Sequence, residues 1–151
     1  MVIPSLAAVG DYVGKDIGCS EWVTIAQDQI DAFAEATGDH QWIHVDVERA
    51  RRESPFRQTV AHGYLVLSLA PALMEQVGRI EGCSSVINVG FDKVRLKQPV
   101  PAGARVRMHV RVKAVRDVPR GGRRVVYVLS FEVEGVPKRA CIAEAILIYY
   151  P

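Results

Sequence analysis

Residues 62–77 (HGYLVLSLAPALMEQV) constrain the fold more than any other segment, because a helix over them is apolar on almost every side. A helix that is hydrophobic all round is buried in a protein core or in a membrane. The segment has about 16 residues, and because a membrane span needs ~20 apolar residues, a core helix is expected. Pro71 removes one backbone donor and predicts a kink, or the end of a first helical segment.

The second half of the chain supplies a sheet against which this helix can pack. Residues 104–116 alternate, with apolar side chains facing one way and basic side chains the other. Residues 123–134 continue the alternation, and further strands are expected over 21–25, 85–96 and 139–150. The order of elements predicts an α+β fold in which a long buried helix covers an antiparallel sheet of about five strands. The basic face of the sheet is expected to meet water.

The first half of the chain reads as helical, with one polar interruption. A helix is expected over 28–37, where Gly38 is a natural C-terminal stop, and a short helical turn over 47–53. The polar segment between them is expected to be a loop. The chain has 151 residues and no evident linker, which predicts a single domain over 1–151. The N-terminus lacks the basic region of a signal peptide, so a cytoplasmic protein without membrane attachment is expected.

The charges are divided unevenly between the two halves. Residues 1–92 carry 6 basic and 13 acidic side chains, whereas residues 93–151 carry 13 basic and 4 acidic ones. A basic half is compatible with a polyanionic partner or with a solvated sheet face. The predicted strand over 105–113 has no aromatic residues interleaved on its basic face, and no nucleic-acid-binding motif is present. A nucleic-acid partner is therefore not expected.

The polar segment between the two predicted helices is the first candidate functional site. Asp39 and His44 lie five residues apart in it, and a carboxylate and an imidazole that converge can hold and polarise a water molecule. The alternative is an ordinary polar loop. A metal site is not expected, because the segment follows Gly38 as a loop and contains no HExxH pattern. The side chains that could serve as ligands in such a site are Asp39, His40, His44, Asp46 and His62.

The second candidate lies at the start of the buried helix, in Ala61-His62-Gly63. The first N–H groups of a helix have no partner within it. A glycine there lets a substrate approach the backbone, where an N–H can stabilise the negative charge that develops on a thioester oxygen. The alternative is that Gly63 only relieves crowding at the helix start.

These residues resemble the hydratase motif of the MaoC-like dehydratases, a family that includes the (R)-specific enoyl-CoA hydratases. A His-Gly pair at the start of the central helix, here His62-Gly63, is a further match. The sequence departs from the family pattern at Ala36, Gln41 and Trp42. Residues 41–46 (QWIHVD) resemble the nodulation protein N-like branch more closely. The motif positions that match are Phe33, Thr37, Gly38, Asp39, Ile43, His44 and Ala50.

The resemblance implies a single hot-dog fold, a homodimer joined edge to edge, and no metal or redox cofactor. It implies that water adds to a trans-2-enoyl-CoA to give an (R)-3-hydroxyacyl-CoA, with Asp39 and His44 as the acid–base pair. It assigns Gly63 to the oxyanion site, and His62 and Gln41 to substrate binding. The alternatives are a non-catalytic acyl-CoA-binding protein and an acyl-CoA thioesterase. The residues considered for contact with the CoA phosphates are Lys93, Arg95 and Lys97.

Overall fold

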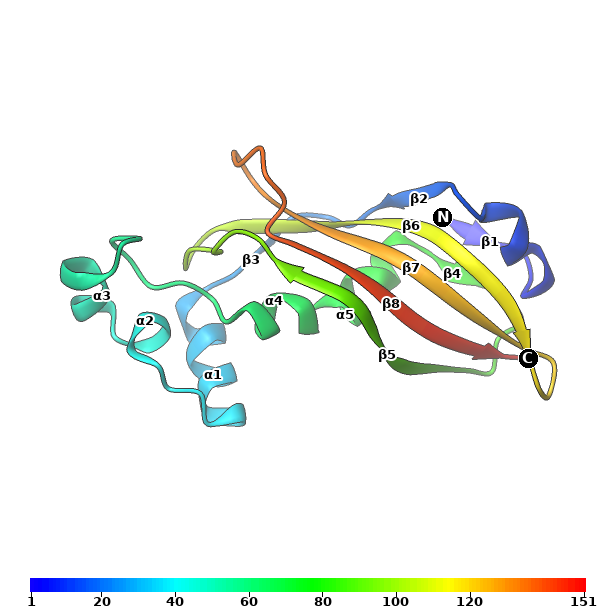
Figure 1. Ribbon diagram of the computed structural model, residues 1–151, viewed down its shortest axis with the longest axis horizontal. Coiled ribbons are helices and arrows are strands. Elements are labelled where there is room, and N and C mark those ends of the chain that lie inside the picture. Colours follow the sequence, from blue (N-terminus) through cyan, green and yellow to red (C-terminus); the bar gives the residue numbers. More distant parts are fainter.

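A curved antiparallel sheet wraps one broken helix in the computed structural model, which describes residues 1–151 (Figure 1). The helix is formed by α4 (Gly63–Ser68) and α5 (Ala70–Val77). Its buried side chains join the inward-facing side chains of the sheet in one continuous hydrophobic core. This is the arrangement that the order of apolar and alternating segments predicts, and it is the hot-dog fold.

The sheet has five strand positions, in the order β2-β6-β7-β8-β5, and β3 also pairs with β6. The two short strands β2 (Asp16–Cys19) and β3 (Val23–Thr24) pair with successive parts of β6, so together they form one interrupted edge. A separate parallel pair joins β1 (Val2–Ile3) to β4 (Arg79–Ile80). The long strands are β5 (Ser85–Leu96), β6 (Arg105–Val118), β7 (Gly122–Val133) and β8 (Cys141–Tyr150).

The alternation predicted for the long strands is confirmed. Every second residue of β7 from Val125 to Val133 is buried, as are the four apolar residues of β6 from Val106 to Val112. The register of β5 against β8 shifts between Asn88 and Gly90, which is the bulge that a glycine within a strand favours. The strand β2, the pair β1–β4 and the 3-10 helix η1 (Ala7–Tyr12) were not predicted, because they are too short to carry a periodic pattern.

The outward face of the sheet is more organised than a simple solvated surface. The side chains of Arg107, His109 and Arg139 all contact Glu132, at 3.0, 2.5 and 2.7 Å. Hydrogen bonds lower the pKa of Glu132 to about 2, and the bond from Arg107 has a larger effect than the bond from His109. Part of the basic face therefore forms cross-strand ion pairs. The carboxylate in these pairs, that of Glu132, comes from the same half of the chain as the basic side chains.

The central helix is interrupted and is not buried on every side. Leu69 separates its two parts, and Pro71 lies in the first turn of α5, where its missing N–H would have no helical partner. This confirms the break predicted from Pro71. The side chains of Ser68, Ala72 and Glu75 are exposed, and Tyr64 is 71% exposed, so the expectation of burial all round was wrong for a single chain. No helix in the structure combines the length and the apolar character needed to cross a lipid bilayer.

Three helices extend beyond the end of the sheet and precede the central helix (Figure 1). They are α1 (Gln27–Thr37), α2 (Trp42–Val45) and α3 (Val47–Glu53). Gly38 ends α1 in the left-handed conformation, with φ of 79°, as predicted. The segment expected to be a loop contains α2, a single turn. These helices bring the polar motif back to the start of α4.

Candidate active site

Asp39 lies at the turn that follows α1, and local hydrogen bonds set the direction of its side chain. The Thr37 hydroxyl donates to the Phe33 carbonyl at 2.8 Å and accepts from the Asp39 N–H at 3.4 Å. The Gln41 N–H donates to Asp39 Oδ1 at 3.3 Å. The Asp39 side chain is 53% exposed. The carboxylate is therefore held from one side and is accessible from the other.

His44 lies on α2 and is buried, and its tautomer follows from its contacts. Nδ1 lies 2.6 Å from the Val60 carbonyl oxygen. A carbonyl only accepts, so Nδ1 carries the proton, and in the neutral ring Nε2 is left as an acceptor. The amide of Gln27 supports this turn by donating to the His44 carbonyl at 2.8 Å, and its own oxygen accepts from Thr59 at 2.5 Å. Nothing in the local sequence around Gln27 or Thr59 signals this supporting role.

His62 immediately precedes α4, and its ring contacts both residues of the polar motif. Nε2 donates to the Asp39 carbonyl oxygen at 2.9 Å and lies 4.0 Å from Asp39 Oδ2. The ring stacks on His44, with centroids 3.9 Å apart and planes inclined by 26°, and its centroid lies 5.0 Å from that of Phe33. Its Nδ1 is buried and has no hydrogen-bond partner. The His62 ring thus contacts both the turn after α1 and the helix α2.

Asp39, His44 and His62 form one cluster, in which a ligand atom from each lies within 4.8 Å of the others. Imidazole lone pairs lie in the plane of the ring, and two nearly parallel stacked rings do not direct theirs toward one ion. Of the other side chains considered for a metal, His40 lies 3.6 Å from Glu35, and Asp46 accepts from the Arg49 N–H at the start of α3. A carboxylate beside an imidazole acceptor is instead suited to holding a water molecule between them.

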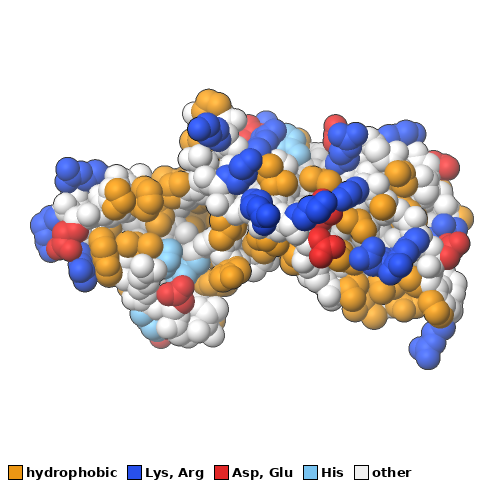
Figure 2. Space-filling view, viewed as in Figure 1, with side chains coloured by type: hydrophobic (Ala, Val, Ile, Leu, Met, Phe, Trp, Pro, Cys, Tyr) orange, Lys and Arg blue, Asp and Glu red, His pale blue; other side chains and the backbone are white.

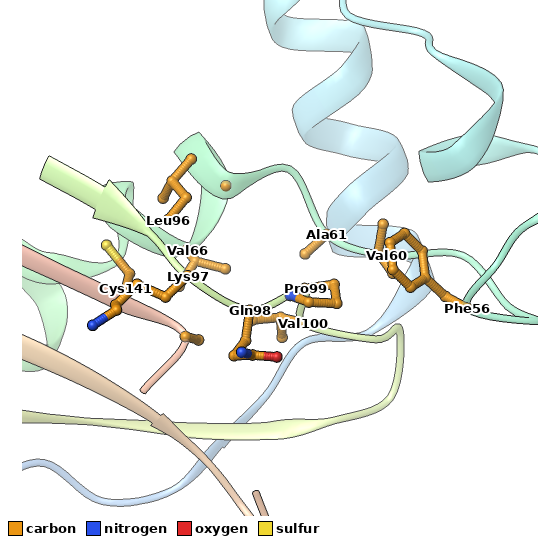
Figure 3. A pocket seen from close by; sticks show the side chains of 12 residues that line it. Phe56, Val60, Ala61, Val66, Leu96, Lys97, Gln98, Pro99, Val100 and Cys141 are labelled. Atoms are coloured by element: carbon orange, nitrogen blue, oxygen red, sulfur yellow. The ribbon is translucent and has the colours of Figure 1, made fainter. Parts of the chain in front are cut away.

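Gly63 begins α4 directly beside this cluster. Its N–H makes no backbone hydrogen bond, and the residue lines a cavity of about 310 Å³. Figure 3 shows this cavity, with Leu96 beside the start of the helix and with Phe56 and Val60 at the other end. A Cβ atom at Gly63 would overlap with the Leu96 side chain, so a larger residue here requires that exposed side chain to move. The close approach of Leu96 is a packing reason for the glycine, beside the functional one.

The basic residues considered for phosphate contacts occupy different environments. Lys97 lines the Gly63 cavity, and its N–H donates to the Ala140 carbonyl at 2.7 Å. Lys93 instead lies 3.3 Å from Glu144, and Arg95 is exposed and donates to the Val94 carbonyl. Gln41 is exposed at the start of α2. Figure 2 shows Lys and Arg scattered over the sheet and the α3 end, without a single basic stripe.

Trp42, one of the three departures from the family motif, lies apart from the Gly63 cavity. Trp42 lies beneath the Arg49 guanidinium, whose carbon is 4.4 Å from the centroid of the indole ring. Trp42 does not line the Gly63 cavity. The indole therefore packs on α3, within the helical extension.

The fold and this cluster define a hot-dog protein of the hydratase and dehydratase kind. A family model described as "MaoC like domain" matches residues 9–133, and the chain belongs to this family. It is 45% identical over 145 residues to 3-hydroxyacyl-thioester dehydratase Z of Mycobacterium tuberculosis, covering 96% of this chain and 95% of that protein. It is 42% identical to nodulation protein N of Rhizobium leguminosarum bv. viciae, covering 95% of this chain and 90% of that protein.

A solved structure shares the whole fold. The monoamine oxidase regulatory protein from Archaeoglobus fulgius superposes with a TM-score of 0.80 at 25% identity, over 100% of this chain and 97% of that one. The resemblance stated from the motif is therefore confirmed, including the proximity to the nodulation protein N-like branch. The expectation of a hydro-lyase is confirmed by the 45% identical dehydratase.

Proposed function

We propose that this protein is an (R)-specific hydratase that adds water reversibly to trans-2-enoyl-CoA to give (R)-3-hydroxyacyl-CoA. The observation that carries the proposal is the convergence of Asp39 and His44 beside Gly63, with His44 Nε2 left as an acceptor by the hydrogen bond at Nδ1. The 45% identity of this chain to a 3-hydroxyacyl-thioester dehydratase supports the same reaction in the reverse direction.

The proposed chemistry uses two acceptors for one water molecule. A water that donates one hydrogen to the Asp39 carboxylate and the other to His44 Nε2 presents an oxygen lone pair to the β carbon of the substrate. As the C–O bond forms, one of the two groups takes a proton from the water, and the electrons of the double bond move toward the thioester oxygen. The Gly63 N–H donates to that oxygen, and the α carbon then receives a proton from the Asp39–His44 pair.

We assign His62 to positioning. Its ring holds the Asp39 backbone and the His44 ring, which are the two groups that must keep their separation for a shared water. Lys97 is the favoured contact for a CoA phosphate because it lines the cavity beside Gly63. Lys93 is less favoured, since it already faces Glu144.

The proposal includes a homodimer joined through β5. This strand lies at the edge of the sheet, and Val86, Ile87 and Val89 are 53%, 50% and 55% exposed on it. An exposed apolar edge strand is a template for pairing with a second chain, and a two-fold arrangement would cover it. Sedimentation velocity is the direct measurement of this part of the proposal.

The decisive experiment follows the loss of enoyl absorbance when purified protein is mixed with crotonyl-CoA and longer trans-2-enoyl-CoAs. Asp39→Asn and His44→Ala are each expected to lower kcat by about 10²–10⁴-fold, which is the usual contribution of general acid–base groups. Asp46→Asn is a matched control, because Asp46 only caps α3. Release of free CoA would indicate the thioesterase alternative, and tight binding without turnover would indicate the binding protein.

The structure adds one observation against a thioesterase. Glu75 is the only acidic residue on the central helix, and it is exposed on α5, near the end opposite Gly63. It is therefore not available to the Asp39–His44 cluster within the same chain.

A further inference from the structure

A second cavity, of about 440 Å³, lies between α5 and the concave face of the sheet. Its lining is mostly apolar and includes Ala70, Met74, Phe91 and Leu147. Ala70 is seven residues beyond Gly63 along the central helix, which corresponds to ~10 Å at the usual helical rise. The cavity is thus suited to the distal part of an acyl chain rather than to the thioester itself.

Two tyrosines place hydroxyl groups in this apolar lining. Tyr127 on β7 and Tyr149 on β8 are 2% and 7% exposed, and both line the cavity. Their hydroxyl oxygens lie 3.0 Å apart, with Tyr127 as donor, and their rings meet edge to face with centroids 6.4 Å apart. The neighbouring inward positions, Val125 and Leu129 on β7 and Leu147 on β8, carry aliphatic side chains. The lining is mostly apolar around the two hydroxyls, and its other polar side chains are Glu75, Arg79 and Asn88.

The two tyrosine hydroxyls have one more proton than the hydrogen bond between them uses. Two hydroxyl groups have two protons, and the bond between them uses one. The proton of Tyr149 has no acceptor within the chain. Burial raises the pKa of Tyr149, and that of Tyr127 further, so both keep their protons at neutral pH. A buried donor without an acceptor costs free energy that two phenylalanines at these positions would not cost.

We propose that the free hydroxyl of this pair selects acyl chains that carry an oxygen substituent, a hydroxyl or keto group, in their distal part. A substrate oxygen at this point accepts from Tyr149, and a substrate hydroxyl can also donate to Tyr127. A plain alkyl chain fills the same cavity but leaves the Tyr149 proton unpaired. Discrimination of this kind is strong when a buried polar group of the protein is satisfied by only one of two substrates. This inference rests on the proposed hydratase function and names its substrate class.

The test compares matched pairs of trans-2-enoyl-CoAs, of medium and long chain length, with and without a terminal hydroxyl. The wild-type kcat/KM is expected to be about fivefold to tenfold higher for the hydroxylated member at the length that reaches the tyrosines, which is the effect of one net hydrogen bond. Tyr127→Phe and Tyr149→Phe each keep one unpaired hydroxyl and are expected to retain part of this preference. The double variant Tyr127→Phe/Tyr149→Phe is expected to abolish it. Tyr150→Phe is the matched control and is expected to behave as wild type, since Tyr150 lies outside the cavity.

Equal kcat/KM values for both members at every chain length would overturn the inference, as would a preference that survives in the double variant Tyr127→Phe/Tyr149→Phe. Hydration of crotonyl-CoA by the wild-type protein separates this failure from failure of the proposed function, because a four-carbon chain is too short to reach the pair. If crotonyl-CoA is not hydrated, calorimetric binding of the same matched pairs to wild type and to the double variant Tyr127→Phe/Tyr149→Phe gives the comparison without turnover. Equal affinities there would reject the tyrosine pair as a selective element.

Discussion

His62 is the residue whose replacement most directly tests how the candidate site is held together. In His62→Phe, an aromatic ring remains against His44 and Phe33, but the donor to the Asp39 carbonyl at 2.9 Å is lost. Losing that hydrogen bond costs about 1 kcal/mol, whereas removing the buried Nδ1 without a partner relieves about 1–3 kcal/mol. The two effects offset each other in part, so the free energy of unfolding is expected to stay the same or to rise by up to about 2 kcal/mol.

The activity of the same variant is expected to fall much more than its stability. Without its anchor the Asp39 turn can shift, and a displacement of about 1 Å at a catalytic group costs up to ~10²-fold in rate. We expect kcat for crotonyl-CoA hydration to fall about 10- to 100-fold, with KM changed less than about threefold, because the interaction is needed for the reacting geometry.

His62→Gln is the matched control, because its side-chain amide can donate to the same carbonyl. It is expected to keep more of the wild-type kcat than His62→Phe. The measurements are initial rates of enoyl loss and urea unfolding followed by circular dichroism. Wild-type kcat in His62→Phe, or equal losses in the two variants, would refute the positioning role.

Three further changes have defined outcomes. Glu132→Gln is expected to lower the unfolding midpoint at pH 7; since the folded-state pKa of Glu132 is lowered to about 2, this stabilisation exists above about pH 4.5 and is lost as the pH falls toward 2. A difference in urea midpoint between wild type and Glu132→Gln that stays constant from pH 7 to pH 2 would contradict this prediction. Lys97→Ala is expected to raise KM for acyl-CoA at low salt with kcat similar, whereas Lys93→Ala should not; steady-state kinetics at two ionic strengths checks both. Gly63→Ala is expected to lower kcat/KM at least about tenfold by displacing Leu96 or the helix start, and wild-type kinetics would remove Gly63 from the site.

The motif residues could be recognised from sequence because their spacing is short and their chemistry is unusual. Asp39 and His44 lie in one short polar segment, which follows a helix whose end Gly38 marks. His62 could be recognised as a candidate, but its ring orientation could not. It lies 23 residues from Asp39, and the contact depends on the paths of α2 and α3 between them. The support of His44 by Gln27 and Thr59 depends in the same way on three separate segments.

The sequence by itself determined the longer helices and strands and most of the side chains that they bury. Helical and strand periodicities are local properties, so the early helices, the broken central helix and the alternating strands could all be predicted without tertiary information. Only the tertiary structure decided how far the central helix is covered, which basic side chains pair with Glu132, and that Tyr127 and Tyr149 share one hydrogen bond inside a cavity. Those features depend on contacts between residues distant in sequence. Local periodicity does not specify such contacts, because strand order, register and loop paths fix them together.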